Sequence, residues 1–371
     1  MAPPTRRRPT EPSTEKVETA LIPRGSVLPQ IATEGGTRTA AEVLAERPDI
    51  RAQVDRFLGA AEAKNTTRAH QADLIVFFTW CQRMGLTPMP ATPDMLVTFL
   101  SNQSAGADGE RPKSVSTVLR YASSISVVHK ANGFVSPVEH PAVQYIIKGI
   151  KRDHGVAHKK KRAFTADVAS RTIPPVSEDD SLLVIRDRAI LLLGLHSAMR
   201  RSEIAALDVE HLVRGLRGIR IFLPKSKTDQ EGRGRFVAVS PTKNENFCAV
   251  RAVDRWLKVT GITTGPLFRG LFRGKLVPEQ RLVGRQVALA VKRALAELSP
   301  DEVRQYSAHS LRAGYVTTAR ERGVDWGSIM MQTGHTQIKT VKGYAHYTED
   351  IFDETRVEDV FRDAFDKKES K

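Results

Sequence analysis

Cysteine and long apolar runs are both scarce in this sequence. The 371 residues include two cysteines, Cys81 and Cys248, which are too few for a disulfide framework or a cysteine-rich zinc site. We expect both to fill core space as reduced thiols. No apolar run reaches the roughly 18 residues that a membrane span needs, and the N-terminal MAPPTRRRPTEPSTEK has no apolar signal core after its arginines. These absences predict a cytoplasmic protein without a membrane partner.

Acidic residues are outnumbered by basic ones. Lys and Arg total 57 against 42 Asp and Glu, which gives a formal charge of +15 and a pI near 9.9. Most of this surplus must lie on the surface, where it attracts a polyanion, either nucleic acid or an anionic membrane. With 40% hydrophobic residues the chain can build an ordinary core, and its length suits two domains.

The first part of the chain is predicted to be a flexible tail followed by an all-helical domain. Residues 1–46 are rich in Pro, Thr, Arg and Gly and show little periodicity. Over 47–150 the apolar residues recur at spacings of three and four, and no alternating strand pattern appears. The expected helices start near Thr66, Thr92 and Ser114, and a short last one covers about 141–151.

A basic segment and a larger mixed domain follow. Residues 151–165 include KRDHGVAHKKKRA, with six Lys or Arg against one Asp, and are predicted to be a linker. The domain over 166–350 is expected to be α+β. Its expected elements are an apolar helix at 182–195, strands at 218–226 and 235–239, and helices at 245–259, 284–298, 309–322 and 325–333. The fold class is therefore mainly α with a small antiparallel β-sheet.

Two basic segments of this domain are suited to bind phosphate. In HSAMRRSEIAAL, Arg200 lies in a turn before a Ser-Glu helix start, and its planar fork of donors matches a phosphate. In the hairpin KSKTDQEGRGR, Lys225 or Lys227 supplies a flexible cation that can reach a DNA groove and can give up a proton. Either segment alone fits an ordinary surface role.

Two further segments carry histidines and a tyrosine. In SAHSLRAGYVT, His309 and Arg312 are three residues apart, so a helix places them on one side. In TGHTQIKTVKGYAHYTED, His335 follows a glycine and Tyr344 comes nine residues later. Each segment alone is common, but the order Arg, Lys, HxxR, GH, Tyr is much more specific.

This ordered set resembles the catalytic domain of the tyrosine recombinase and integrase family. That family has an arginine before a Ser-Glu helix start, as in AMRRSE, then a hairpin lysine, HxLR with a following glycine, GH, and a tyrosine about nine residues after that histidine. The resemblance is strong over about 175–350 and weaker over 47–150, which is similar to the family's helical core-binding domain. It implies a catalytic set of Arg200, Lys227, His309, Arg312, His335 and Tyr344, with Glu203 in a supporting role.

Two of these assignments have rivals. Lys227 fits the hairpin lysine better than Lys225 because SKTD lies nearer the turn, and it is the candidate general acid for the leaving 5′-oxygen. Tyr344 fits the nucleophile better than Tyr347 on its spacing and on the Ala-His that follows it.

The resemblance implies DNA cleavage without a metal, a cofactor or ATP. Tyr344 would attack a phosphodiester, form a 3′-phosphotyrosine bond and free a 5′-hydroxyl, so that the covalent bond keeps the energy for rejoining. Arg200 and Arg312 would hold the non-bridging oxygens. His309 would accept the tyrosine proton or orient the phosphate, and His335 would donate to a non-bridging oxygen. The sequence has no cluster of carboxylates at metal-ligand spacing, which agrees with this mechanism.

The implied partners are double-stranded DNA with inverted-repeat recombination sites and three further copies of the chain, with accessory proteins left open. Residues 351–371 are expected to include a helix with Val357, Val360, Phe361 and Phe365 on one face. We expect this face to dock on a neighbouring protomer, the alternative being its own domain. A type IB topoisomerase-like enzyme and a non-catalytic DNA-binding regulator are the competing functions. The compact helical domain and the short apolar tail favour the recombinase.

Overall fold

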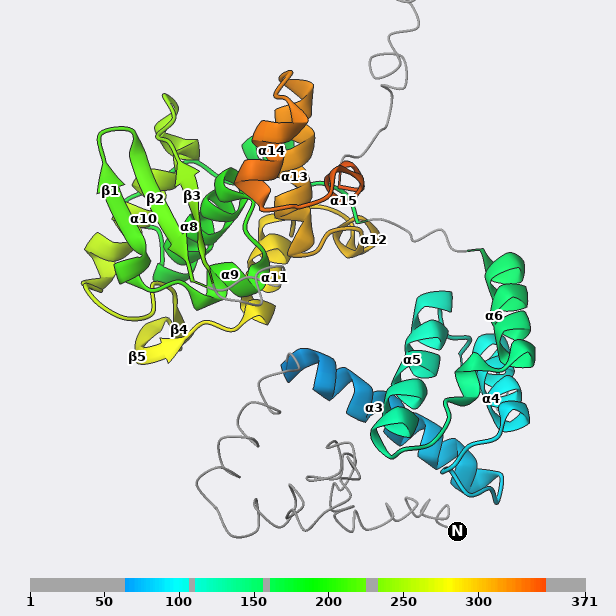
Figure 1. Ribbon diagram of the computed structural model, residues 1–371. Helices are drawn as coiled ribbons and strands as arrows, with labels where there is room; N and C mark the ends of the chain where they lie inside the picture. The colour runs from blue at the N-terminus through cyan, green and yellow to red at the C-terminus, as the bar shows by residue number, and fades with distance from the viewer. Residues whose placement is uncertain (1–63, 107–110, 156–160, 225–232, 345–371) are drawn as a thin grey trace, which may run out of the picture. The chain divides into compact units, whose positions relative to one another are not determined.

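The computed structural model describes residues 64–106, 111–155, 161–224 and 233–344 (Figure 1). The chain divides into two compact units, Met1–His158 and Lys159–Lys371. The predicted tail over 1–46 and the predicted C-terminal helix over 351–371 lie outside the described residues. No helix in the described ranges is long and apolar enough to cross a lipid bilayer.

The described part of the first unit is helical, as expected. Its elements are α3 (Lys64–Arg83), α4 (Pro93–Ala105), α5 (Val115–Ala131), the 3₁₀ turn η1 (Pro137–Glu139) and α6 (Pro141–His154). The starts follow side-chain capping, because Thr92 Oγ1 accepts from the Met95 amide and Ser114 Oγ from the Thr117 amide. The core is mainly aromatic and aliphatic and also holds Cys81.

The boundary between the units differs from the predicted linker at both of its ends. Helix α6 continues to His154, so the first residues of the expected linker are helical. At the other end, the Arg162 amide donates to Gln305 O and the Phe164 amide to Ser310 O, each at 2.8 Å. Main-chain hydrogen bonds therefore attach residues 162–164 to the second unit.

The second unit contains two antiparallel sheets in its described residues. The first has the order β1 (Leu212–Gly215), β2 (Gly218–Leu223) and β3 (Arg235–Val239), and the second pairs β4 (Arg269–Phe272) with β5 (Lys275–Arg281). Strands β2 and β3 confirm the predicted pair, with Ile221 opposite Val237. The sequence did not predict β1 or the β4–β5 hairpin, because β1 has only four residues and β5 is mostly polar and contains Pro278.

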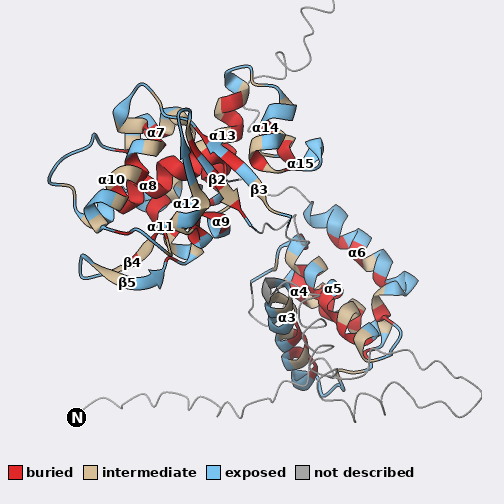
Figure 2. Cartoon of the chain, turned by 60° about the vertical axis from the view of Figure 1, so that its left-hand side comes forward, coloured by how far each residue is buried: buried red, intermediate tan, exposed pale blue. Residues whose placement is uncertain are grey.

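Helices surround a central helix, α8, that is buried along most of its length (Figure 2). Helix α8 packs against α10, α11, α13 and strand β3. Because it is mostly apolar and buried on all sides, it forms the middle of the core rather than one face of it. The helices of this unit are α7 (Ala166–Thr172), α8 (Leu182–Ser197), α9 (Arg201–Ala206), α10 (Ala249–Thr260), α11 (Gly284–Ala294), α12 (Pro300–Arg304), α13 (His309–Glu321), α14 (Trp326–Thr333) and α15 (Ile338–Lys342), with 3₁₀ turns η2 (Val209–His211) and η3 (Glu245–Phe247). The short α7, α12 and α15 span too few turns to show a periodicity.

The glycine that follows the HxLR motif lets α13 lie directly against the main chain of residue 164. A Cβ atom at Gly314 would be 1.9 Å from Phe164 O. A contact that short requires backbone movement, so position 314 accepts only glycine without moving α13 or the 164 segment. Helix α13 carries Arg312, which makes this approach part of what places the site.

We therefore expect Gly314→Ala to destabilise the protein although alanine favours helices. In an open helical position the change from glycine to alanine stabilises the protein by up to about 1 kcal/mol. Gly149 in α6 is the matched control, because nothing lies within 4 Å of its Cβ position. Gly314→Ala should cost about 2 kcal/mol or more. Hydrogen exchange read by mass spectrometry on peptides from α13 and α6 measures both effects. Equal protection of α13 in wild type and Gly314→Ala would contradict this account.

Candidate active site

The first predicted arginine lies directly after the C-terminus of α8. Ala198 ends that helix in the left-handed conformation, with φ of 54°, which costs a non-glycine residue about 1 kcal/mol. This reversal makes Arg200 the residue before α9. Glu203 accepts from the Arg200 amide with Oε2 at 2.7 Å and from Arg200 Nη1 with Oε1 at 2.8 Å. The side chains are 12% and 4% exposed, so a buried carboxylate orients the Arg200 guanidinium.

The second predicted arginine is fully buried on α13. Arg312 is 0% exposed, and its Nη1 donates to the Ala198 carbonyl at 2.8 Å. Its Nη2 lies 2.9 Å from His335 Nε2, and its Nε has no hydrogen-bond partner among the described residues. Burial, followed by the positive charge of Arg200, lowers the pKa of Arg312 to about 10. The guanidinium thus stays charged at neutral pH while part of its donor capacity is unused.

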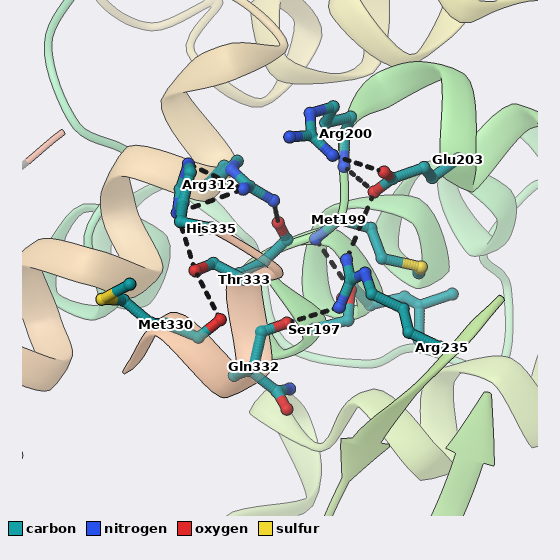
Figure 3. Close-up of polar contacts among 12 residues, drawn as sticks. Ser197, Met199, Arg200, Glu203, Arg235, Arg312, Met330, Gln332, Thr333 and His335 are labelled. Carbon is teal, nitrogen blue, oxygen red and sulfur yellow. Dashed lines mark hydrogen bonds and ion pairs between the residues drawn. The ribbon is translucent and has the colours of Figure 1, made fainter. Parts of the chain in front are cut away.

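A hydrogen-bond chain fixes which nitrogen of His335 carries the proton. Thr333 Oγ1 donates to Ile329 O at 2.8 Å, which uses its only hydrogen. The same oxygen lies 2.8 Å from His335 Nδ1 and can accept from it, which favours a proton on Nδ1 over the arrangement in which Nδ1 accepts from Arg312 Nη2 at 3.3 Å. His335 Nε2 is then the lone-pair nitrogen that accepts from Arg312 Nη2. Figure 3 shows this chain from Thr333 through His335 to Arg312.

The surroundings of His335 keep its ring neutral. His335 is 8% exposed and directly follows Gly334, which ends α14 in the left-handed conformation. Burial, and then the charges of Arg312, Arg200 and Arg235, lowers the pKa of His335 to about 3. The group that the sequence predicted as a phosphate contact is therefore an uncharged imidazole at neutral pH.

Tyr344 lies beside this pair, two residues after α15 ends. Its amide donates to Val341 O at 2.9 Å, and its ring centroid is 5.2 Å from that of His335. Arg312 Cζ lies 5.6 Å from the centre of the Tyr344 ring, a distance at which a cation and a ring attract. Elements far apart in sequence thus bring the predicted tyrosine, the second arginine and the second histidine together.

The remaining predicted residues are placed less completely. His309 is the first residue of α13 and is exposed, one turn before Arg312 and therefore on its side of the helix. Lys227, its rival Lys225 and the rival nucleophile Tyr347 lie outside the described residues.

Three side chains of the site were not predicted. Arg235, the first residue of β3, places Nη2 3.7 Å from Glu203 Oε2 and donates from Nη1 to Gln332 O at 2.9 Å. Thr333 fixes the His335 ring, and the amide of Gln332 bonds to strand β3. An arginine at a strand end is ordinary in sequence. The available signals were its position just after the lysine hairpin, and two polar residues just before Gly-His.

The charges of the site favour an anion. Arg200, Arg235 and Arg312 are three guanidiniums around the single carboxylate of Glu203, and His335 adds no charge. Two positive charges are in excess where burial strengthens electrostatic interactions. A phosphodiester, which gains charge when a nucleophile attacks it, suits such a site. In the described ranges no group of three or more His, Cys, Asp or Glu side chains is placed to hold a metal ion.

The neutral His335 makes stability depend on pH. Its pKa of about 3 in the folded protein lies below the ordinary value of about 6.5, so between these values only the unfolded chain binds the proton. The stability that His335 contributes is complete above about pH 6.5 and is lost as the pH falls toward 3. From pH 7 to 4.5 this should lower the free energy of unfolding by about 2 to 3 kcal/mol.

His335→Gln should remove that part of the acid sensitivity. Urea unfolding at pH 7 and 4.5 measures it in a Trp80→Phe background, in which the two remaining tryptophans, Trp256 and Trp326, both report on the second unit. Carboxylates contribute to the pH dependence of both proteins, so the comparison isolates His335. If wild type and His335→Gln lost the same unfolding free energy between pH 7 and 4.5, the His335 ring would not be held neutral in the folded protein.

Comparisons with known proteins show the family and the fold. The model of the phage integrase family matches residues 164–350. An integrase/recombinase XerD homologue of Selenomonas ruminantium is 32% identical over 302 residues, which cover 81% of this chain and 86% of that protein. Recombinase Cre of Escherichia phage P1 is 24% identical over 283 residues, which cover 71% and 79%.

Two solved structures share the fold at low sequence identity. XerH recombinase bound to palindromic difH DNA has a TM-score of 0.54 at 14% identity, over 79% of this chain and 78% of that one. A lambda integrase fragment, a dimer on a COC′ core site, has a TM-score of 0.54 at 14% identity, over 81% and 96%. With the family match over residues 164–350 and the relative that is 32% identical, these findings show that the chain belongs to the phage integrase family and is a tyrosine site-specific recombinase.

Proposed function

We propose that the chain cuts and rejoins DNA strands at inverted-repeat sites through a 3′-phosphotyrosine bond to Tyr344. The observation that carries this proposal is the position of the Arg312 guanidinium, which contacts His335 and lies over the ring of Tyr344. A phosphodiester bound to Arg312 would lie next to Tyr344, the tyrosine whose ring contacts this guanidinium. Attack by the phenol oxygen would release the 5′-oxygen, and reversal would rejoin the strand without ATP or a metal.

The two arginines are proposed to hold the non-bridging oxygens. Among the described residues Arg312 Nε has no hydrogen-bond partner, and phosphate can also replace His335 as the partner of Nη2. Arg200 is oriented by Glu203 at 2.8 Å, so one of its edges is fixed while the rest of the fork is available. Donors that are already aimed at the developing charge stabilise the transition state without reorganisation.

His335 needs a second proton to act as the donor that the family resemblance implies. Its Nδ1 proton is held by Thr333 and its Nε2 accepts from Arg312, so the unbound site offers phosphate no N–H from this ring. The negative charge of a bound phosphodiester opposes the arginines that lower the His335 pKa, which favours protonation at Nε2. His309 as proton acceptor and Lys227 as general acid complete the proposed set.

The assembly and biological role extend the same proposal. We propose a homotetramer on two DNA sites in the cytoplasm, associated with the nucleoid when it binds DNA, with residues 47–150 as the core-binding domain and 351–371 docked on a neighbouring protomer. The XerH and lambda integrase structures contain DNA, which supports a DNA partner. Integration or excision of a mobile element and resolution of a replicon both fall within the proposal, because the relatives include Xer-type and phage recombinases.

A suicide-substrate experiment tests the reaction. The full chain is incubated with nicked duplexes made from DNA flanking its gene and from a randomised pool, and adducts that survive denaturation are sequenced. We expect recovered DNA to share an inverted repeat, with the phosphate on a tyrosine peptide that contains Tyr344. No adduct on any DNA would overturn the enzymatic proposal in favour of a binding protein. Relaxation of plasmids that lack the recovered site would favour the topoisomerase alternative.

A further inference from the structure

Arg235 connects three parts of the site that are distant in sequence. It is the first residue of β3, and its side chain is 19% exposed. Its Nη1 donates to Gln332 O at the end of α14, at 2.9 Å, and its Nη2 lies 3.7 Å from Glu203 Oε2 on α9. Figure 3 shows the guanidinium between Gln332 and Glu203. One side chain thus contacts the strand, the helix that orients Arg200 and the turn that carries His335.

A second set of bonds attaches the same turn to the same strand. Gln332 Nε2 donates to Ala238 O at 2.7 Å and to His196 O at 3.2 Å, and Gln332 Oε1 accepts from the Ala238 amide at 3.4 Å. The end of α14 is therefore bound to β3 at Arg235 and at Ala238. Two attachment points three residues apart prevent the turn from rotating on the strand.

Gly334 leaves the space that the Arg235 side chain occupies. A Cβ atom at Gly334 would lie 2.7 Å from Arg235 Nε and 2.9 Å from its Cζ. Because Gln332 O and Glu203 both hold the guanidinium, it cannot move aside without losing a contact. Glycine therefore suits position 334 for two reasons. It adopts the left-handed backbone conformation that ends α14, and it leaves room for the Arg235 side chain.

Stability alone does not explain a guanidinium in this place. Arg235 Nε and Nη2 are buried and have no hydrogen-bond partner among the described residues. Burial lowers the pKa of Arg235, the Glu203 carboxylate acts against this shift, and the positive charge of Arg200 adds to it. Unsatisfied buried donors are costly. Glu203 Oε1 lies 2.8 Å from Arg200 Nη1, and Glu203 Oε2 lies 3.7 Å from Arg235 Nη2. Arg235 therefore competes with Arg200 for the Glu203 carboxylate.

We propose that Arg235 is a positioning residue for DNA strand cleavage. It fixes His335 relative to Arg200 by holding Gln332 and Glu203, and it limits how strongly Glu203 neutralises Arg200. It acts through these neighbours and does not contact the reacting atoms. This inference rests on the proposed cleavage by Tyr344 and adds a residue to it.

Arg235→Gln separates positioning from charge attraction. Misplacement of reacting groups by about 1 Å can cost about 100-fold in rate, so the cleavage rate constant at saturating protein should fall by about that factor. DNA affinity should change by less than about threefold, since one cation of many is lost. Arg235→Lys should recover part of the rate. Arg217→Gln, an exposed arginine in the turn between β1 and β2 of the same sheet, is the control and should cleave like wild type.

Gly334→Ala tests the same contact without touching Arg235. Gly261→Ala is its match, because Gly261 also ends a helix in the left-handed conformation, at φ of 66° against 70°, with nothing within 4 Å of its Cβ position. Both variants place an alanine in the left-handed conformation that ends a helix, so Gly261→Ala controls for the general cost of that substitution, and the Arg235→Gln background isolates the slowing that comes from displacement of Arg235. In the Arg235→Gln background, Gly334→Ala should add no slowing beyond that of Gly261→Ala.

The outcomes distinguish this inference from the proposed function. No adduct with wild-type protein overturns the proposed function and the inference with it. Wild-type cleavage by Arg235→Gln, or equal rates for Gly334→Ala and Gly261→Ala, overturns the inference alone. Circular dichroism and the DNA affinity of each variant show whether it is folded. If Arg235→Gln fails to fold, the comparison of the two glycine variants still decides.

Discussion

Tyr344→Phe is expected to abolish the covalent protein–DNA adduct and to leave DNA binding almost unchanged. The substitution removes one oxygen and keeps the ring that lies 5.2 Å from His335 and 5.6 Å below the Arg312 guanidinium. Local packing is therefore preserved while the nucleophile is lost. Removal of a nucleophile from a covalent catalyst lowers the rate by about 10⁴-fold or more, which is below detection in an adduct assay.

Tyr347→Phe provides the matched control, since it changes a tyrosine three residues later in the same chain segment. Single-turnover reactions on a nicked substrate measure both variants, and filter binding at matched salt measures affinity. An adduct formed by Tyr344→Phe, together with loss of the adduct in Tyr347→Phe, would transfer the nucleophile to Tyr347. Loss of the adduct in both variants with normal affinity would mean that the segment after α15 must keep both hydroxyls.

Local chemistry made much of the fold predictable. The Thr92 and Ser114 caps mark the starts of α4 and α5 because each side-chain oxygen accepts from an amide two or three residues into the helix. Helix α8 was predictable as a strongly apolar segment, and β2 and β3 as a strand pair across a polar turn. These signals are contained in short windows of sequence, where propensity and pattern agree.

The sequence singled out residues that the structure brings together, but not the contacts between them. The order of motifs identified Arg200, Arg312, His335 and Tyr344, because a pattern of residue types survives in sequence. The bond from Arg312 to the Ala198 carbonyl joins residues 114 positions apart, and it depends on a left-handed alanine for which the sequence gives no sign. Contacts of this kind arise only when α13 packs against α8.

The same reason explains why Arg235 was not predicted as part of the site. Its contacts reach Gln332, 97 positions later, and Glu203 on another element, while its own neighbours in sequence belong to a polar hairpin. Likewise, Thr333 fixes the His335 tautomer only because α14 ends in a turn that folds the ring back toward its hydroxyl. Residues such as Arg235 and Thr333 act through contacts between different elements, whereas the patterns in a single sequence predict contacts only within one helix or strand.

Arg312→Met is expected to lower the single-turnover cleavage rate by about 10² to 10³-fold, which corresponds to about 3 to 4 kcal/mol of transition-state stabilisation. The substitution removes the fork that we propose holds a non-bridging oxygen. It also removes one of the charges that lower the His335 pKa. The His335 pKa should therefore rise above about 3, and NMR titration of the labelled imidazole measures that rise.

Arg320→Met, on the same helix and stacked over Trp326, is the control for loss of an arginine from α13 and should keep both the rate and the His335 pKa.

The free energy of unfolding of Arg312→Met is expected to change much less than its cleavage rate. Arg312 is charged, fully buried and has an unsatisfied Nε, and replacing such a group by an apolar one of similar length is often neutral. Its Ala198 bond is lost, so we expect a change in unfolding free energy within about 2 kcal/mol. Normal cleavage by Arg312→Met would remove this arginine from the phosphate site. A large loss of rate at nearly unchanged stability would mean that the protein keeps a buried guanidinium for chemistry rather than for folding.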